Sequence, residues 1–517
     1  MSEPRPIVAV QDLGVSHDGA TELEKLSFRL ESGESLVILG DAASGKDALL
    51  RVLGGYTVRS DEISGTVQYG DGPSLPATKR GKPTIRTVYL GGGEAPLNPY
   101  SSVQSQLARI VSRRHASPGA SAREELRMAL ERLDGAPDFS VLQKKPGELD
   151  RVDLSWALLA AAMAQLPDLL IADHAFSNLT PVALQKVLAA LMAEQKRLGF
   201  ALIFVTDGLM AAAHLKSRMI VLRRGQVIEE GAFEKLARGQ SHAYTRTLFR
   251  ALPRAQDGLP PRAARGEPLL QVQALDLTPR KSKGPRPRDG LSFELRRGAA
   301  LALIGEEGSG RRALVRALLG LERFAGGRVV LDQVDMSILS ETMTARLRRR
   351  IAFVTGADDA LDPRMTIWDT VDEPLRAHLR IPRDMVAGHR ETALKRVGLA
   401  SHDGRSTVAT LSPFDKRRLQ VARAIVSAPF LAVIDEPLSG LDAFAQSILI
   451  ELLDDLRKQE GPAFIVITAN VGVAQALAED ALFFKDGKLI ERGPLRDVLK
   501  NPKDDETRKL IAAAAPP

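Results

Sequence analysis

Short apolar runs alternate along the chain with stretches in which apolar positions recur at helical spacing. Residues 35–39 (SLVIL) form one such run, a glycine-rich loop follows it, and the pattern of residues 46–53 predicts a helix. Residues 200–206 and 464–468 are similar continuous apolar runs, typical of strands that are buried on both faces. Because such strands alternate with helices, the sequence predicts an α/β fold class with parallel sheets flanked by helices.

Two further stretches, residues 100–145 and 366–405, are predicted to be mainly helical and to form a smaller lobe beside each sheet. The longest uninterrupted apolar run, residues 156–164, has nine residues. A membrane-spanning helix needs about 20, so we expect no span, and the first ten residues predict no secretory signal.

The same succession of landmarks occurs twice along the chain. The segment LSFRL at residues 26–30 recurs as LSFEL at residues 291–295, and Gly40 of one glycine loop corresponds to Gly305 of another, both 265 positions later. Further pairs are the apolar runs that end at Asp173 and Asp435, and the segments GQVIEEG and GKLIERG. This order predicts two tandem domains, residues 5–252 and 267–512, joined by a Pro/Arg-rich linker at residues 253–266.

The amino-acid composition excludes several kinds of site and partner. The 517 residues include no cysteine, which excludes disulfides, thiolate zinc sites and cysteine-held iron–sulfur clusters and favours a reducing cytoplasm. The formal net charge is +7, and a positive net charge is often found in nucleic-acid-binding proteins. In this chain, however, the excess of basic residues is dispersed, and only 4% of residues are aromatic, so few side chains are available to stack on bases. We therefore expect no nucleic-acid partner.

The first glycine loop has the form of a phosphate-binding loop (P-loop). Residues 40–47 (GDAASGKD) match G-x-x-x-x-G-K-[S/T] except at the last position. In such a loop backbone N–H groups surround phosphate oxygens, the lysine adds a positive charge and the final hydroxyl holds Mg²⁺. The candidate nucleotide-binding residues are Gly40, Ser44, Gly45, Lys46 and Asp47. Asp47 replaces the hydroxyl, and it either contacts Mg²⁺ or stabilises the first helical turn.

The second loop, residues 305–312 (GEEGSGRR), keeps the glycines but has Arg311 and Arg312 in place of the lysine and the hydroxyl. Arginine is bulkier than lysine and planar, so the exchange is not conservative. Two alternatives follow. Either the loop still binds phosphate through Gly305, Gly308, Gly310 and Arg311, or Glu306 and Glu307 neutralise the arginines without any nucleotide.

Together with LSGLD at residues 438–442, which is similar to a D-loop, these motifs resemble a tandem ABC-type ATPase, the nucleotide-binding subunit of ABC transporters. DPRMTIWDTVDEPL at residues 362–375 and the tail patterns of both copies resemble the oligopeptide/dipeptide/nickel importer branch. The resemblance implies two P-loop NTPase (ABC cassette) domains, each with a mainly parallel sheet and a helical subdomain. It also implies ATP and Mg²⁺ as cofactors, bound between two cassettes that pair head to tail.

The resemblance also implies roles for single residues. Asp173 and Asp435 correspond to the aspartates that hold Mg²⁺, and Glu436 corresponds to the catalytic glutamate. Ser412 is the one residue of the two signature motifs that is expected to offer a hydroxyl to the γ-phosphate, and Asp442 is the D-loop aspartate.

Several family positions have lost their usual residue. The catalytic glutamate of the first copy is His174, which is either a substitute base or a structural residue. Lys46 and Glu436 lie in different copies, so neither composite site has both. The remaining departures are at the adenine-stacking position (His17, Pro279), the Q-loop (Gly91, Thr355), the signatures (residues 149–153 and 411–415), the first D-loop (Thr180) and the switch histidine (Asp207, Ala469).

The expected function is that of the ATP-binding subunit of a peptide/nickel-type ABC importer with impaired hydrolysis. The expected partners are two membrane permeases and a solute-binding protein, with a second cassette subunit as a further candidate. We expect the chain in the cytoplasm, peripheral on the inner face of the cell membrane. The alternative is a catalytically inactive pseudo-ATPase that acts as a scaffold or regulator, and the sequence leaves open whether the chain is an enzyme.

Overall fold

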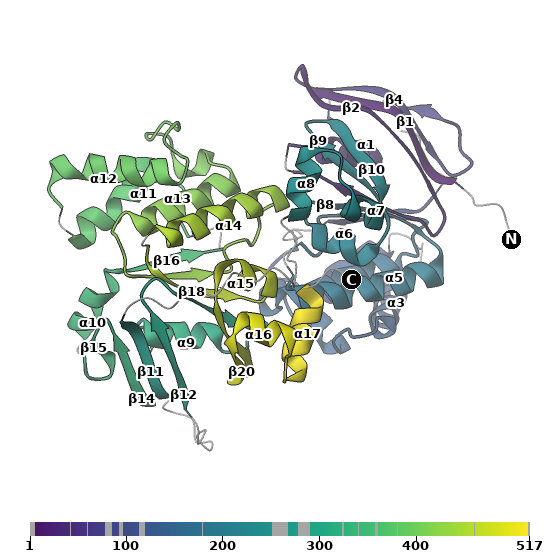
Figure 1. Cartoon of the computed structure of the whole chain (residues 1–517). Coiled ribbons are helices and arrows are strands. Elements are labelled where there is room, and N and C mark those ends of the chain that lie inside the picture. Colours follow the sequence, from purple (N-terminus) through teal and green to yellow (C-terminus); the bar gives the residue numbers. More distant parts are fainter. Residues whose placement is uncertain are drawn as a thin grey trace. The chain divides into compact units, whose positions relative to one another are not determined.

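The computed structural model describes residues 6–514, with gaps at 42, 59, 78–84, 92–96, 113–118, 178, 251–266, 278–289, 323–324, 340, 357–359, 380 and 460. The chain divides into two compact units after Leu252, and both are α/β units (Figure 1). The predicted linker and Pro279 lie outside the described residues. No described helix is both long and apolar enough to span a membrane.

The first unit is built on a six-stranded sheet in the order β10-β9-β3-β8-β7-β6, in which only β10 and β9 are antiparallel neighbours. All residues of β8 are buried, as its continuous apolar run predicts. The strands are β3 (Ser35–Leu39), β6 (Thr87–Gly91), β7 (Leu169–Asp173), β8 (Ala201–Thr206), β9 (Arg218–Arg223) and β10 (Gln226–Ala232).

A second, antiparallel sheet in the order β2-β1-β4-β5 completes the core of this unit. Helix α1 (Lys46–Gly54) buries Leu49 and Leu53 in the same apolar cluster as Val8 of β1 and Leu36 of β3. This packing anchors the helix that follows the first glycine loop. The strands are β1 (Pro6–His17), β2 (Ala20–Glu31), β4 (Asp61–Tyr69) and β5 (Leu75–Pro76).

Helices cover the rest of the first unit and include the predicted helical lobe. α2, α3 and α4 contact one another and share an apolar cluster. The helices are α2 (Val103–Ser112), α3 (Gly119–Arg132), α4 (Arg151–Ala164), α5 (Pro181–Leu198), α6 (Leu209–Leu215), α7 (Phe233–Arg238) and α8 (Ala243–Arg250), with 3₁₀ turns η1 (Phe139–Gln143) and η2 (Pro146–Glu148).

The second unit repeats this architecture. Its six-stranded sheet has the order β16-β17-β18-β13-β19-β20, the first unit's order taken from the opposite end, and its antiparallel sheet has the order β12-β11-β14-β15. The predicted duplication and the α/β fold class are therefore confirmed. The strands are β11 (Pro268–Asp276), β12 (Leu291–Arg296), β13 (Ala300–Ile304), β14 (Gly326–Leu331), β15 (Val334–Asp335), β16 (Ile351–Thr355), β17 (Leu431–Asp435), β18 (Ala463–Thr468), β19 (Asp480–Lys485) and β20 (Lys488–Pro494).

The second helical lobe forms where residues 366–405 predict it, with α11 and α12 packed against α13 (Figure 1). The helices of this unit are α9 (Arg311–Leu318), α10 (Glu341–Arg348), α11 (Ile367–Pro374), α12 (Arg383–Arg396), α13 (Pro413–Ile425), α14 (Ala443–Lys458), α15 (Val471–Leu477), α16 (Leu495–Lys500) and α17 (Asp505–Ala514), with shorter turns η3 (Met336–Ile338), η4 (Leu375–Leu379) and η5 (Val408–Thr410).

Candidate nucleotide sites

The predicted site residues of each unit gather at the carboxyl edge of its parallel sheet. In the first unit the glycine loop follows β3, Asp207 follows β8, and His174 follows β7. Because β8 lies between β3 and β7, these loops are neighbours at the edge where α/β sheets bind ligands. The second unit places its glycine loop, Ala469 and Glu436 in the same way after β13, β18 and β17.

Both glycine loops need glycine immediately before their helix. Gly45 and Gly310 each have φ 95°, a left-handed conformation that disfavours other residues. A Cβ on Gly45 would lie 2.3 Å from the carbonyl oxygen of Glu22, and one on Gly310 would lie 2.9 Å from Cα of Gly487. The two loops therefore share this left-handed glycine immediately before the helix although their side chains differ.

Lys46 lies inside the first loop as a buried cation. Its side chain donates a hydrogen bond of 2.6 Å from Nζ to the carbonyl of Gly40. Burial lowers the pKa of Lys46, although the carboxylates of Asp207 and Asp47 oppose this shift. Ser44 Oγ is buried beside it without a hydrogen-bond partner among the described residues, and Asp47 is exposed on the first turn of α1. These groups are suited to a phosphate, and both predicted roles of Asp47 stay open.

Asp173 at the end of β7 keeps one carboxylate oxygen for a metal. Tyr89 of β6 donates its hydroxyl to Oδ2, whereas Oδ1 is buried and has no hydrogen-bond partner in the described part of the chain. Burial and this hydrogen bond raise the pKa of Tyr89, so the hydroxyl stays protonated. A carboxylate oxygen of this kind fits Mg²⁺. No motif pointed to Tyr89, because its partner lies on the neighbouring strand, 84 positions away.

His174 and Asp207 lie together beside this site. Nδ1 of His174 is 3.4 Å from Oδ1 of Asp207, and its Nε2 is 3.9 Å from Asp173. Burial acts to raise the pKa of Asp207, but the hydrogen bond from His174 and the charge of Lys46 outweigh it and lower the pKa overall. The resemblance predicts a glutamate and a histidine at these two positions, whereas this chain has His174 and Asp207, an imidazole and an acid in the opposite order.

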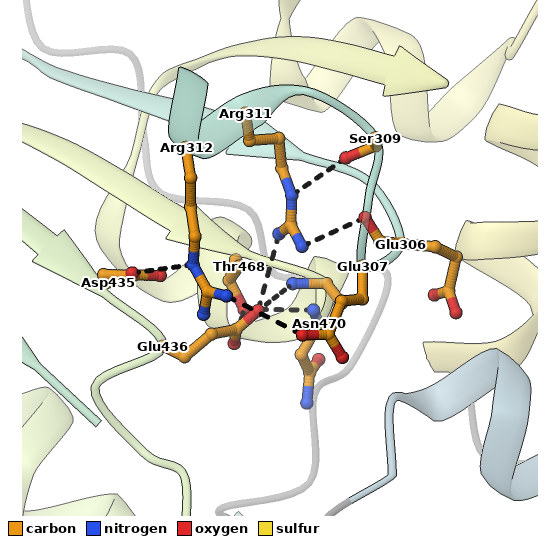
Figure 2. A network of polar contacts seen from close by, with 10 residues as sticks. Glu306, Glu307, Ser309, Arg311, Arg312, Asp435, Glu436, Thr468 and Asn470 are labelled. Carbon is orange, nitrogen blue, oxygen red and sulfur yellow. Dashed lines mark hydrogen bonds and ion pairs between the residues drawn. The ribbon is translucent and has the colours of Figure 1, made fainter. Parts of the chain in front are cut away.

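In the second unit, Arg311 and Arg312 form ion pairs with the acids at the end of β17 (Figure 2). Nε of Arg312 lies 3.0 Å from Oδ2 of Asp435, and Nη1 of Arg311 lies 3.4 Å from Oε1 of Glu436. The alternative that Glu306 and Glu307 neutralise the arginines is therefore only partly right. Arg311 reaches the backbone carbonyl of Glu306 at 3.3 Å, and Glu307 lies 3.8 Å from Arg312.

Both carboxylate oxygens of Glu436 have hydrogen-bond partners. Its Oε2 accepts a 3.0 Å hydrogen bond from Thr468, and its Oε1 accepts a 2.8 Å hydrogen bond from the N–H of Ala469 in addition to the contact with Arg311. Burial raises the pKa of Glu436, although Arg311 and these hydrogen bonds oppose the rise. Both oxygens of this carboxylate are engaged within the unit.

The second site does not fit Mg²⁺. Arg312 stands where the P-loop hydroxyl would be, offers no oxygen ligand, and places a positive charge against Asp435. Oδ1 of Asp435 is buried and without a hydrogen-bond partner among the described residues, but a dication there would be repelled by the guanidinium.

The degenerate signature segments begin helices. Asp150 caps α4 by accepting a hydrogen bond of 2.8 Å from the N–H of Asp153. Ser412 caps α13 by accepting one of 3.1 Å from the N–H of Asp415, to whose carboxylate its hydroxyl donates. Thr180 caps α5 in the same manner.

Other predicted positions are occupied as follows. His17, at the adenine-stacking position, has Nδ1 2.9 Å from Asp61. Gly91 and Thr355 end β6 and β16, and Asp442 directly precedes α14. Besides Tyr89, the structure adds Tyr244, which was not predicted as a site residue. The hydroxyl of Tyr244 in α8 lies 3.1 Å from N and 3.2 Å from Oδ2 of Asp41, so the tail of the first unit contacts the first loop.

The chain is similar to known proteins, among them two ATP-binding proteins of transport systems. Residues 288–439 match the ABC transporter family. The glutathione import ATP-binding protein GsiA of Escherichia coli K12 is 28% identical, over 98% of this chain and 89% of that protein. The peptidoglycan transport ATP-binding protein YejF of Agrobacterium fabrum is 29% identical, over 99% of this chain and 96% of that protein. The solved structure of cbiO1 from Clostridium perfringens covers 46% of this chain and 92% of its own, at 24% identity and a TM-score of 0.42. The second unit thus contains a domain that matches the ABC transporter family, the first unit repeats its architecture, and the chain is similar over nearly its whole length to the ATP-binding proteins GsiA and YejF.

Proposed function

We propose that the chain is the ATP-binding subunit of an ABC importer for a peptide-type solute. It works with two membrane permeases and a solute-binding protein, and is peripheral on the inner face of the cell membrane. The alignment with GsiA and YejF over nearly the whole chain supports this proposal, since their names describe glutathione import and peptidoglycan transport. The importer-type tails in the sequence support it independently.

The first cassette is the proposed ATP site. The observation that carries this assignment is the buried Lys46, held in the glycine loop with Asp173 at the end of a strand two positions along the sheet. Lys46 supplies positive charge to the phosphates, and Asp173 is the residue that would hold Mg²⁺. Bound Mg²⁺ would offset phosphate charge.

Hydrolysis is proposed to be slow. The first cassette has His174 instead of a glutamate, and in the second both oxygens of Glu436 are engaged by neighbouring groups. Loss of a general base typically costs about 10²–10⁴ in rate. Binding of ATP, rather than rapid turnover, would then drive the permeases.

The test is binding of a fluorescent ATP analogue with Mg²⁺ to the purified chain. Lys46→Ala should weaken binding by about 10- to 100-fold, because a charged phosphate contact is lost. Lys186→Ala is the matched control, since Lys186 is exposed on α5 of the same cassette, and it should bind as the parent does. Affinity-tagged chain should also retain two permeases from detergent-solubilised membranes. Binding that is indifferent to Lys46→Ala, or isolation of the chain without permeases, would contradict the proposal.

A pseudo-ATPase scaffold is the second candidate. The pairing of Arg312 with Asp435 favours it, because this arrangement excludes metal from one of the two cassettes. Phosphate release at background level, measured with the permeases present and unchanged by Lys46→Ala, would support the scaffold. Phosphate release that Lys46→Ala abolishes would rule it out.

A further inference from the structure

The second cassette contains two cations of its own at the place where a P-loop protein holds a lysine and a metal ion. We propose that Arg311 and Arg312 form a built-in cationic clamp, which takes the place of both and organises this cassette without nucleotide or Mg²⁺. This inference concerns the second cassette alone and does not depend on the proposed ATP site of the first.

Arg312 acts in place of the metal. Its side chain leaves helix α9 beside the loop and is 60% exposed, yet Nε lies 3.0 Å from the carboxylate of Asp435, whose side chain is only 10% exposed. A buried carboxylate needs a positive partner, because removing an unpaired charge from water is costly. Arg312 supplies that partner from within the chain.

Arg311 joins three segments that a nucleotide would otherwise bring together. Nε donates to Ser309 Oγ at 3.1 Å, and Nη2 donates to the carbonyl of Glu306 at 3.3 Å, so Arg311 holds the loop to its own helix. Nη1 reaches Glu436, which directly follows β17 and in turn accepts hydrogen bonds from Thr468 at the end of β18 and from Ala469 just after it. Figure 2 shows this network running from the loop across the sheet edge. The Arg311 side chain is 8% exposed, so these contacts are shielded from solvent.

The acids at the ends of β7 and β17 have different partners in the two cassettes. In both cassettes the aspartate keeps one buried oxygen without a hydrogen-bond partner among the described residues. In the first, the other oxygen of Asp173 accepts a hydrogen bond from the neutral hydroxyl of Tyr89 and not from an arginine, which leaves its charge to Mg²⁺. In the second, Asp435 and Glu436 are already paired with the arginines. The clamp therefore stabilises the second cassette permanently and makes it a structural partner rather than a second nucleotide site.

The experiment uses the full chain with Lys46→Ala and Asp173→Asn, which silence the first cassette, and compares it with the same chain carrying Arg312→Ser. Thermal unfolding is followed with and without Mg²⁺, and Mn²⁺ binding is followed by electron paramagnetic resonance. Without metal, Arg312→Ser should lower the unfolding midpoint by roughly 3–10 °C, because Asp435 is left as an unpaired buried charge. Mg²⁺ should raise the midpoint of this variant and leave the parent unchanged, and Mn²⁺ should bind only the variant.

Arg316→Ser is the matched control. Arg316 lies on the same helix, is 59% exposed, and pairs with Glu322 at 2.7 Å on the surface. Exposed pairs contribute little, so this change should shift the midpoint by less than about 3 °C. Equal effects of Arg312→Ser and Arg316→Ser, or Mn²⁺ binding by the parent, would overturn the clamp.

A double-mutant cycle covers the case in which Arg312→Ser alone does not fold. Adding Asp435→Asn removes the unpaired charge, so the double variant should be more stable than Arg312→Ser by itself, and the two losses should not add. Additive losses would disprove the pairing. Either result leaves Lys46-dependent ATP binding by the native chain to be judged separately, so the failure of one proposal is distinguishable from that of the other.

Discussion

At the scale of single residues, His174 and Glu436 occupy equivalent positions with different chemistry. Their φ angles are 46° and 45°, a region that non-glycine residues seldom adopt. Both backbone N–H groups donate 2.9 Å hydrogen bonds to the next strand, at Val205 and Ile467. The strained backbone has thus been kept in both cassettes while the side chains changed. Strain of this kind is typical of functional sites and persists here because the sheet imposes it.

Tyr89→Phe tests whether the tyrosine hydroxyl competes with Mg²⁺ for Asp173. Removing the hydroxyl frees Oδ2, so the Mg²⁺ affinity of nucleotide-bound chain should rise about 2- to 10-fold, the equivalent of one hydrogen bond. The measurement is a Mg²⁺ titration of bound fluorescent nucleotide. Tyr56→Phe is the control, because Tyr56 packs edge-on against the Tyr89 ring at 5.8 Å and should leave the affinity unchanged. A weaker Mg²⁺ affinity in Tyr89→Phe would show that the hydroxyl supports the site instead.

At the scale of elements, the degenerate signatures have kept their role as helix starts. Asp150 and Ser412 are both N-caps, with extended backbone and a side chain that accepts an N–H of the first turn. A helix that begins without such a partner leaves backbone donors unsatisfied. Loss of the family's signature residues is therefore compatible with an intact helical lobe.

Ser412→Ala should destabilise the second cassette by about 0.5–2 kcal/mol, because the first turn of α13 loses its cap. Chemical denaturation followed by circular dichroism measures the change. Ser412→Asn, which retains a capping oxygen, should recover most of the stability. If both variants unfolded like the parent, the cap would not contribute to stability. The γ-phosphate role that the resemblance implies would then be the remaining role for the Ser412 hydroxyl.

At the scale of the whole molecule, the two units share one architecture and differ in the polar groups at their sheet edges. Both sheets have the same strand order and both loops have the same left-handed glycine. The polar groups at the sheet edges differ, with Lys46 and Asp173 in one cassette and a pair of arginines in the other. We propose that such a chain has two copies of the fold and one site that takes Mg²⁺ and nucleotide together.

The chain should accordingly bind one equivalent of Mg-ATP rather than two. Isothermal titration calorimetry gives the stoichiometry directly. Lys46→Ala should weaken the measured binding by about 10- to 100-fold, whereas Arg311→Ala should leave affinity and stoichiometry unchanged, since the second cassette does not take part. Two equivalents in the parent chain, or a loss of binding in Arg311→Ala, would contradict this division.

Much of the fold was predictable from local sequence. The run at residues 35–39 became β3 with the same bounds, and the helix expected at residues 46–53 became α1, which is one residue longer. Apolar periodicity and glycine position act between near neighbours in the chain, so they can be read without the fold. The duplication and the first P-loop were identified on the same basis.

The tertiary structure alone decided which charges meet. The sequence directed attention to Glu306 and Glu307, which adjoin the arginines in the chain, but the main partner of Arg312 is Asp435, 123 positions away. In the sheet, β17 lies two strands from β13, so the acids at its carboxyl end lie close to the glycine loop that follows β13. No local sequence pattern encodes this strand order. Charges pair according to distance in space and burial, and both quantities exist only once the sheet has formed.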